Sequence, residues 1–227
     1  YKNLNLNNAD EVKVFFKNNN YDVIIFLVGL AHKKGKNKDL NDFRNTNVKT
    51  AEVLLDFLKN ENKVPSKFIF FSTISIYGER YNLEEYNEYT EPKPISPYAV
   101  TKLEFENYLK KVLDNNRLWV LRLAPVYSQK YLNNIDRRTR VKNIYYRVGS
   151  GDLKLSLCNI KNIKDVIVGI ISDKIPTGTY NLSDKNHYSY NELLDFKDAD
   201  KSIILLIFLI KISYNLGKIT GNIFLIE

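Results

Sequence analysis

A tyrosine and a lysine four residues apart carry the clearest chemistry in the sequence. Tyr98 and Lys102 stand in the segment SPYAVTK, residues 96–102. On a helix, side chains at this spacing lie on the same face, one turn apart. A phenol, with a pKa of about 10, is a poor base at neutral pH, but a nearby ammonium favours the phenolate. The pair can therefore exchange a proton with a hydroxyl group. The spacing alone also fits a Tyr and a Lys that merely share a helix surface.

Hydroxyl side chains follow an apolar run upstream of this pair. The run Phe68–Phe71 has no polar alternation, and Ser72, Thr73 and Ser75 come directly after it. In a parallel sheet a ligand lies at the carboxyl ends of the strands, so these hydroxyls can hydrogen-bond a reacting oxygen there. A plain turn rich in Ser and Thr is the alternative interpretation.

Strands and helices alternate along the first part of the chain. Strands are expected at Asp22–Gly29, Phe68–Phe71 and Leu118–Leu123, and helices at Phe43–Leu58 and Pro97–Leu113. Continuous apolar strands are typical of a parallel sheet buried on both faces. Ser96 as a cap and Pro97 at the first position mark the start of the second helix. This order predicts an α/β fold with a doubly wound parallel sheet over residues 1–128.

The pattern loosens after Pro125. Short elements and a Gly-Ser-Gly turn at residues 149–151 predict a smaller, irregular substrate-binding region over residues 129–227. Within it, Ser202–Ile212 has an apolar face and is expected to form a carboxyl-terminal helix.

The composition argues against several classes of protein. One cysteine, Cys158, leaves no internal disulfide framework and fits a reducing, cytoplasmic compartment. With only two His besides, a zinc site of Cys and His ligands is not expected. The net charge of +8 is spread along the chain rather than gathered in one block, so no nucleic-acid partner is expected. The longest apolar run, Ile203–Ile210, is too short for a bilayer span, which needs ~20 residues.

Taken together, these segments resemble the NAD-dependent epimerase/dehydratase branch of the extended short-chain dehydrogenase/reductase family. The resemblance rests on DVIIFLVG (22–29), NTNVKT (45–50) against the family's NVxGT, STISIYG (72–78) against SSxxVYG, and the YxxxK dyad at Tyr98 and Lys102. Weaker matches are LRLAPVY (121–127) against LRPxxVYG, and YNL (180–182).

The resemblance implies a Rossmann sheet that binds NAD, or alternatively NADP, and a small carboxyl-terminal region that binds a nucleotide sugar. It makes Tyr98, Lys102 and Thr73 the catalytic residues. The residues it places at the cofactor are Asn5, Leu27, Val28, Gly29, Asn47, Ser72, Tyr98, Lys102 and Pro125. The residues it places at the substrate are Thr73, Ser75, Tyr98 and Lys154. The family's usual homodimer would use the helices 43–58 and 97–113.

Several functions share these residues. A 4-epimerase of a nucleotide sugar with tightly held NAD, in cell-surface polysaccharide or sugar-nucleotide metabolism, is the first hypothesis. A 4-keto-sugar reductase that consumes NADPH has the same dyad. A dehydratase ranks third, because no Asp-Glu pair stands beside Thr73. A non-catalytic remnant that kept the fold is the alternative from another class, and the intact Tyr98, Lys102 and Thr73 argue against it.

The family's glycine-rich GxxGxxG turn is not found in the sequence. It is expected before residue 1, which makes the chain a fragment that lacks the first βαβ unit. Because that turn and its helix bind the cofactor pyrophosphate, we expect the isolated chain to bind NAD weakly and to be unstable or inactive. Calorimetric titration with NAD and a thermal melt check this. Ordinary NAD affinity together with a sharp melt would contradict it.

Overall fold

The computed structural model describes residues 4–30, 40–78, 85–199, 201–206, 208 and 212. The chain divides into two compact units. Unit 1 comprises Tyr1–Gly78, Tyr86–Arg122 and Ile170–Asn181, and unit 2 comprises Glu79–Glu85, Leu123–Gly169 and Leu182–Glu227.

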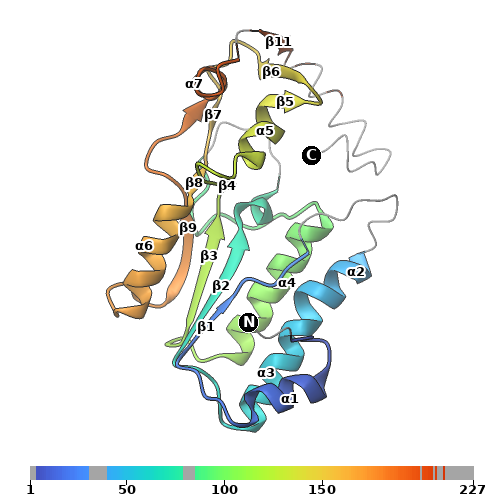
Figure 1. Cartoon of the computed structure of the whole chain (residues 1–227), viewed down its shortest axis with the longest axis vertical. Helices are drawn as coiled ribbons and strands as arrows, with labels where there is room; N and C mark the ends of the chain where they lie inside the picture. The colour runs from blue at the N-terminus through green and yellow to red at the C-terminus, as the bar shows by residue number, and fades with distance from the viewer. Residues whose placement is uncertain are drawn as a thin grey trace. The chain divides into compact units, whose positions relative to one another are not determined.

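Unit 1 is built on a sheet with the strand order β1-β2-β3-β9. The strands are β1 (Val23–Phe26), β2 (Lys67–Thr73), β3 (Leu118–Leu123) and β9 (Gly178–Leu182). β1 and β2 pair in parallel, with Ile25 opposite Ile69, and Figure 1 shows β3 pointing the same way. The carboxyl ends of these three strands therefore meet at one edge of the sheet. The predicted α/β class with a parallel sheet is confirmed.

The helices predicted at Phe43–Leu58 and Pro97–Leu113 are confirmed, and unit 1 has further helical segments beside them. The helical segments are α1 (Ala9–Lys17), α2 (Leu40–Arg44), the π-helix η1 (Asn45–Lys49), α3 (Thr50–Asn60), the 3₁₀ helix η2 (Ile74–Tyr77) and α4 (Pro97–Val112). α2, η1 and α3 follow one another without a break. At the start of α4, the Ser96 hydroxyl accepts a hydrogen bond from the Ala99 backbone at 3.3 Å, and Pro97 takes the first position. Both features of the predicted helix start are confirmed.

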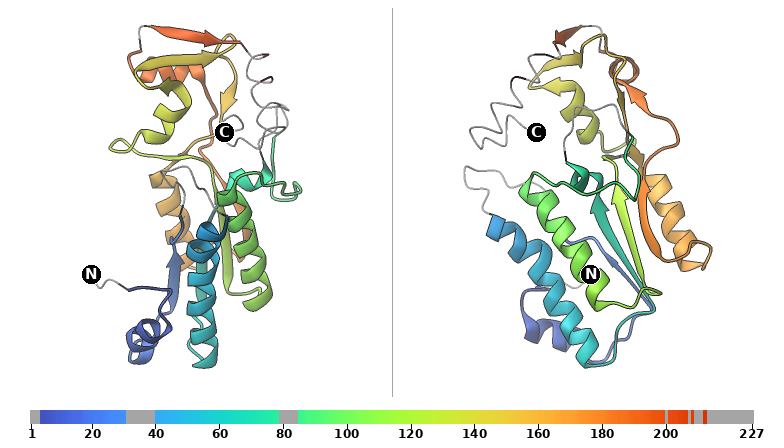
Figure 2. Two further views of the ribbon diagram at one scale, coloured as in Figure 1. Left: turned by 90° about the vertical axis from the view of Figure 1, so that its right-hand side faces the viewer. Right: turned by 180° about the vertical axis from the view of Figure 1, so that it is seen from behind.

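An apolar core joins the helices to the sheet, with α1, α3 and α4 on one face (Figure 1, Figure 2). The fully buried ring of Phe105 on α4 meets the ring of Phe70 edge-on, with centroids 4.5 Å apart, and that of Phe26 at 5.3 Å. Aromatic pairs prefer this geometry. Phe105 therefore fixes α4 against both β1 and β2.

The prediction that Asp22–Gly29 is a strand buried on both faces was wrong in part. The strand is shorter, Val23–Phe26, and Ile25 and Leu27 are 37% and 62% exposed. Successive side chains of a strand point to opposite faces. Phe26 packs in the core, whereas Ile25 and Leu27 lie on the face away from it. In the described part of the chain, β1 pairs with β2 and no other strand, so it is an edge strand of this sheet.

Trp119 on β3 is the only tryptophan in the sequence. Its side chain is buried, and its indole Nε1 donates to the Ile175 carbonyl at 3.1 Å. The Lys67 amine lies 5.7 Å from the centroid of its ring. These contacts tie β3 to the segment that leads into β9.

Unit 2 consists of short elements. Its helices are α5 (Asn133–Thr139), α6 (Ile160–Ile171, whose last two residues belong to unit 1) and α7 (Tyr190–Phe196). Its strands are β4 (Val126–Tyr127), β5 (Arg140–Val141), β6 (Ile144–Val148), β7 (Lys154–Leu155), β8 (Cys158–Asn159), β10 (Tyr188–Ser189) and β11 (Ser202–Leu205). They form the small sheets β11-β6-β5, β10-β7 and β4-β8. The irregular character predicted for this part of the chain is confirmed. Across the described ranges, no helix is both long and apolar enough to cross a bilayer.

The prediction of a helix over Ser202–Ile212 was wrong for its first residues. Ser202–Leu205 forms β11, which runs parallel to β6 with Ile203 opposite Tyr146. Isoleucine is β-branched and favours strands, and periodicity cannot separate strand from helix in so short an apolar run. Residues 207 and 209–211 of the predicted helix lie outside the described residues.

Phe105→Ala is expected to lower the free energy of unfolding by about 3–5 kcal/mol, because it leaves a cavity at a fully buried ring. Urea denaturation followed by circular dichroism measures the loss. The control is Val14→Ala, at a side chain that is 75% exposed, with an expected change below about 0.5 kcal/mol. Equal losses in the two variants would contradict the proposed role of Phe105 in the core.

Candidate active site

Tyr98, Lys102 and Thr73 come together in unit 1, where α4 passes the carboxyl end of β2. The Tyr98 phenol shares a hydrogen bond with the Thr73 side chain. The Lys102 amine lies 5.9 Å from the centroid of the Tyr98 ring. Thr73 is the amino-terminal cap of η2, and its hydroxyl accepts from the Ser75 backbone at 3.2 Å. The local turn therefore presents the Thr73 hydroxyl to the phenol.

The Lys102 amine is buried, with 4% of the residue exposed. It donates a hydrogen bond to the Phe71 carbonyl at 2.8 Å and lies 4.7 Å from the centroid of the Phe70 ring. Burial lowers the pKa of Lys102 from 10.5 to about 8, and the carboxylate of Glu106 opposes that fall. Near neutral pH the amine thus carries a charge that it loses easily.

The Tyr98 phenol behaves differently from the sequence-based expectation. Burial raises its pKa, and the hydrogen bond with Thr73 offsets only part of the rise. The expected lowering of the pKa by Lys102 is absent from this site, because removing the phenol from water disfavours the phenolate more than its neighbours favour it. Tyr98 therefore keeps its proton at neutral pH.

Asn47 links the end of β1 to α4. Its side chain is buried, its Oδ1 accepts from the Leu30 backbone at 2.5 Å, and its Nδ2 donates to the Thr101 hydroxyl at 3.0 Å. Asn47 sits in the π-helix η1, and such wider turns re-aim side chains within a helix. Asn47 thereby fixes the segment after β1 relative to α4, the helix that carries Tyr98 and Lys102.

Gly29, three residues after β1, lies directly against the Lys102 amine. Leu27 and Gly29 are exposed, and Val28 is half-buried against the core. A Cβ atom at Gly29 would lie 3.0 Å from the Lys102 amine, so a larger residue would crowd it. The backbone of Gly29 thus passes beside the buried amine at a distance that only a residue without a side chain allows.

Two other predicted residues of unit 1 are engaged elsewhere. Ser72 is buried, and its hydroxyl donates to Glu106 Oε1 at 2.5 Å. Asn5 is exposed, and its backbone N–H donates to Glu11 Oε2 at 3.0 Å. Ser75, by contrast, is exposed with its hydroxyl 3.2 Å from that of Thr73. The Ser75 hydroxyl therefore lies beside that of Thr73, whereas the Ser72 hydroxyl is bound inside the protein, and the roles expected for Ser72, Ser75 and Asn5 stay predictions.

Pro125 and Lys154 belong to unit 2. The Pro125 carbonyl accepts from the Cys158 backbone at 3.0 Å. Lys154 is exposed and pairs with Glu192 at 3.3 Å. The pKa of Glu192 is lowered to about 2, mainly by its hydrogen bonds with Ser189 and further by this contact with Lys154. The cofactor and substrate roles expected for these two residues stay predictions.

The sequence reasoning missed Glu106 and Arg122. Glu106 is completely buried on α4, and Arg122 on β3 is 4% exposed. Glu106 lies four residues after Lys102 and thus on the same helix face. An acidic residue one turn beyond the lysine was the available signal.

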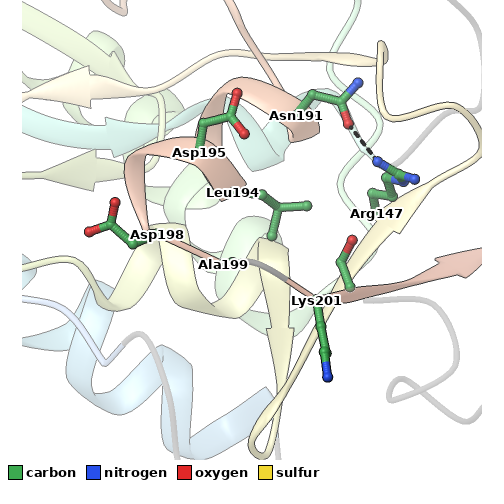
Figure 3. A pocket seen from close by; sticks show the side chains of 8 residues that line it. Arg147, Asn191, Leu194, Asp195, Asp198, Ala199 and Lys201 are labelled. Atoms are coloured by element: carbon green, nitrogen blue, oxygen red, sulfur yellow. Dashed lines mark hydrogen bonds between the residues drawn. The ribbon is translucent and has the colours of Figure 1, made fainter.

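Unit 2 contains a separate cavity of about 650 Å³ (Figure 3). Its lining residues are Arg147, Asn191, Leu194, Asp195, Asp198, Ala199, Lys201 and Ser202. Arg147 Nη1 donates to Asn191 Oδ1 at 3.3 Å, and Arg147 Nε has no hydrogen-bond partner in the described part of the chain. None of the predicted site residues lines this cavity. The ranges that the structure describes also hold no group of three His, Cys, Asp or Glu suited to a metal ion.

A sequence model described as "NAD dependent epimerase/dehydratase family" matches residues 2–167. A search of curated proteins found no match. Solved structures do match. A UDP-glucuronic acid 4-epimerase from Bacillus cereus in complex with NAD has 23% identity and a TM-score of 0.66, over 86% of this chain and 65% of that enzyme.

Two further structures are similar to the chain. A UDP-glucose 4-epimerase from Thermus thermophilus, in complex with NAD, has 18% identity and a TM-score of 0.68, over 89% of this chain and 70% of that one. A UDP-glucose 4-epimerase from Thermotoga maritima with UDP-glucose has 20% identity and a TM-score of 0.67, over 91% and 71%. These likenesses show a shared Rossmann-like fold. The chain spans less than two thirds of the length of the Bacillus cereus enzyme.

The lowered pKa of Lys102 predicts how stability depends on pH. Between about pH 8 and the unfolded value of 10.5, the unfolded chain holds a proton on Lys102 that the folded chain has lost. Stability therefore rises with pH in this window, by about 1.4 kcal/mol per unit. The free energy of unfolding of the natural chain, minus that of Lys102→Met, is expected to rise between pH 8 and pH 9.5. Urea denaturation at both pH values measures it, and a constant difference would contradict the assignment.

Proposed function

Because the chain belongs to the NAD dependent epimerase/dehydratase family, we propose that it is the major part of an NAD-dependent nucleotide-sugar 4-epimerase. The observation that carries the proposal is the contact between Tyr98 and Thr73 beside the buried Lys102. Structures of the same fold, named as UDP-glucose and UDP-glucuronic acid 4-epimerases and bound to NAD, support it.

In this proposal the Tyr98 oxygen moves the proton of the reacting sugar hydroxyl. It accepts that proton when the alcohol is oxidised and returns it to the keto oxygen in the second half of the reaction. The raised pKa of Tyr98 favours the return step, in which the phenol is the donor. The first step needs a phenolate, so the Tyr98 phenol must first release its own proton to solvent; the positive charge of a bound nicotinamide ring would favour that release.

Thr73 and Ser75 hold the sugar oxygen. Their hydroxyls lie 3.2 Å apart at the carboxyl end of β2, and Thr73 already contacts the phenol. A sugar hydroxyl that bonds both Thr73 and Tyr98 has its proton directed at the phenol oxygen.

NAD, when bound, supplies the acceptor and donor of hydride. Lys102 and the backbone of Leu27 and Gly29 would hold its riboside part, because the Gly29 backbone lies directly against the amine. Asn47 would keep this strip in place through its bond to Leu30. Residues 129–227 are proposed to bind the nucleotide sugar, in a cytoplasmic pathway of sugar-nucleotide or polysaccharide metabolism.

Tyr98→Phe is expected to lower kcat by about 10²–10⁴-fold, because it removes only the proton carrier. Chromatography of UDP-glucose and UDP-galactose after incubation with enzyme and NAD measures the conversion. The control is Tyr108→Phe, on the same helix, whose hydroxyl lies 3.4 Å from Asp56 and outside the site. It is expected to keep full activity.

Two outcomes would overturn the proposal. In one, Tyr98→Phe keeps the activity of the natural chain. In the other, the natural chain interconverts no nucleotide sugars and instead oxidises NADPH in proportion to a 4-keto sugar, which would make it a reductase.

A further inference from the structure

A buried ion pair lies one helical turn beyond the dyad. Glu106 on α4 is completely buried and Arg122 on β3 is 4% exposed. Arg122 Nη2 lies 2.8 Å from Glu106 Oε2, and Arg122 Nε lies 3.2 Å from Oε1. Charges this far from water are costly unless they are paired and hydrogen-bonded. The reaction proposed above does not use either residue directly.

The carboxylate of Glu106 also reaches the strand that carries Thr73. Its Oε1 accepts from the Ser72 hydroxyl at 2.5 Å. Ser72 stands between Phe71, whose carbonyl accepts from the Lys102 amine, and Thr73, which contacts Tyr98. Ser72, which Glu106 holds in place, thus sets the positions of the Phe71 carbonyl and the Thr73 hydroxyl, which Lys102 and Tyr98 contact.

The elements that pack against α4 carry titratable groups that could act on Lys102. The elements that pack most closely against α4 are α2, η1, β2 and η2. The titratable groups on the packed elements are Asp42, Arg44, Lys49, Lys67 and Tyr77, and those on α4 besides Lys102 are Tyr98, Glu104, Glu106, Tyr108, Lys110 and Lys111, with Arg122 reached through Glu106. Arg44 is bound to the partly exposed Glu104, and the Tyr77 hydroxyl accepts from Arg122 at 2.7 Å. Lys110 lies 3.8 Å from Glu106.

Of these groups, Glu106 is the negative charge that acts on the Lys102 amine. Its carboxylate raises the pKa of Lys102 against the effect of burial. Because the two residues are four apart on a helix, their side chains lie on one face at close range.

We propose that Glu106 is a positioning residue of the Tyr98–Lys102 site, which keeps the Lys102 amine charged and held against the carbonyl of Phe71. Its relevance to catalysis rests on the proposed function, but its action on Lys102 is measurable without activity. Glu106 acts through Lys102 and Ser72 and touches neither sugar nor cofactor.

The test is the titration of Lys102 in Glu106→Gln. The chemical shift of the Lys102 Cε carbon is followed by NMR from pH 6 to pH 11, and the signal is assigned by its loss in Lys102→Met. The midpoint is expected to fall by on the order of one pH unit in Glu106→Gln, which lacks the charge but keeps the size of the side chain. The control Glu104→Gln, a partly exposed position on the same helix, is expected to keep the midpoint of the natural chain.

A second variant is needed because Glu106→Gln leaves Arg122 buried without its partner, which can prevent folding. Glu106→Gln with Arg122→Gln removes both charges, and a midpoint below that of the natural chain is again expected, with a smaller shift. A folded single or double variant whose Lys102 midpoint equals that of the natural chain overturns the proposal. The epimerase assay is separate. An inactive natural chain with the expected shift defeats the proposed function and leaves the role of Glu106 standing.

Discussion

The hydrogen bond from the Lys102 amine to the Phe71 carbonyl joins the helix of the dyad to the central strand of unit 1. The contact measures 2.8 Å and lies inside the protein. A buried ammonium needs polar partners, because water no longer solvates it. The neighbours of Lys102 meet this need together. The Phe71 carbonyl accepts a hydrogen bond from the amine, Glu106 balances the charge of the amine, and Gly29 has no side chain that would crowd it. The place of Tyr98, one turn earlier on the same helix, follows from where the lysine is fixed.

Burial acts on the two groups of the dyad in opposite senses. It raises the pKa of the Tyr98 phenol and lowers that of the Lys102 amine, because each change favours the neutral form. At rest the site therefore holds a neutral proton donor next to an amine whose charge is easily lost. Such a pair suits the return of a proton to a keto oxygen, because burial keeps the phenol in its protonated form.

Much of unit 1 could be predicted because its signals are local. Ser96 and Pro97 mark a helix start, and the Tyr98–Lys102 spacing fixes a shared face whatever the helix packs against. The exposed side of β1 could not be predicted, because Ile25 is apolar whether or not an element covers it. β11 was missed for a related reason, since pairing with β6 decides the state of a short isoleucine run. The Glu106–Arg122 pair depends on residues 16 positions apart, on a helix and a strand, and spacing within one element does not show such a contact.

Trp119 gives the molecule a built-in optical probe. It is the only indole in the sequence and lies buried on β3 of unit 1, with its Nε1 bound to a carbonyl and a lysine amine near its ring. Its emission wavelength and quenching depend on that surrounding. Light emitted by tryptophan therefore reports on the sheet of unit 1 alone, whereas peptide absorbance in the far ultraviolet sums over both units. If the two signals change at different denaturant concentrations, the units unfold separately. The unfolding of unit 2 is then the part of the far-ultraviolet change that the tryptophan signal does not show.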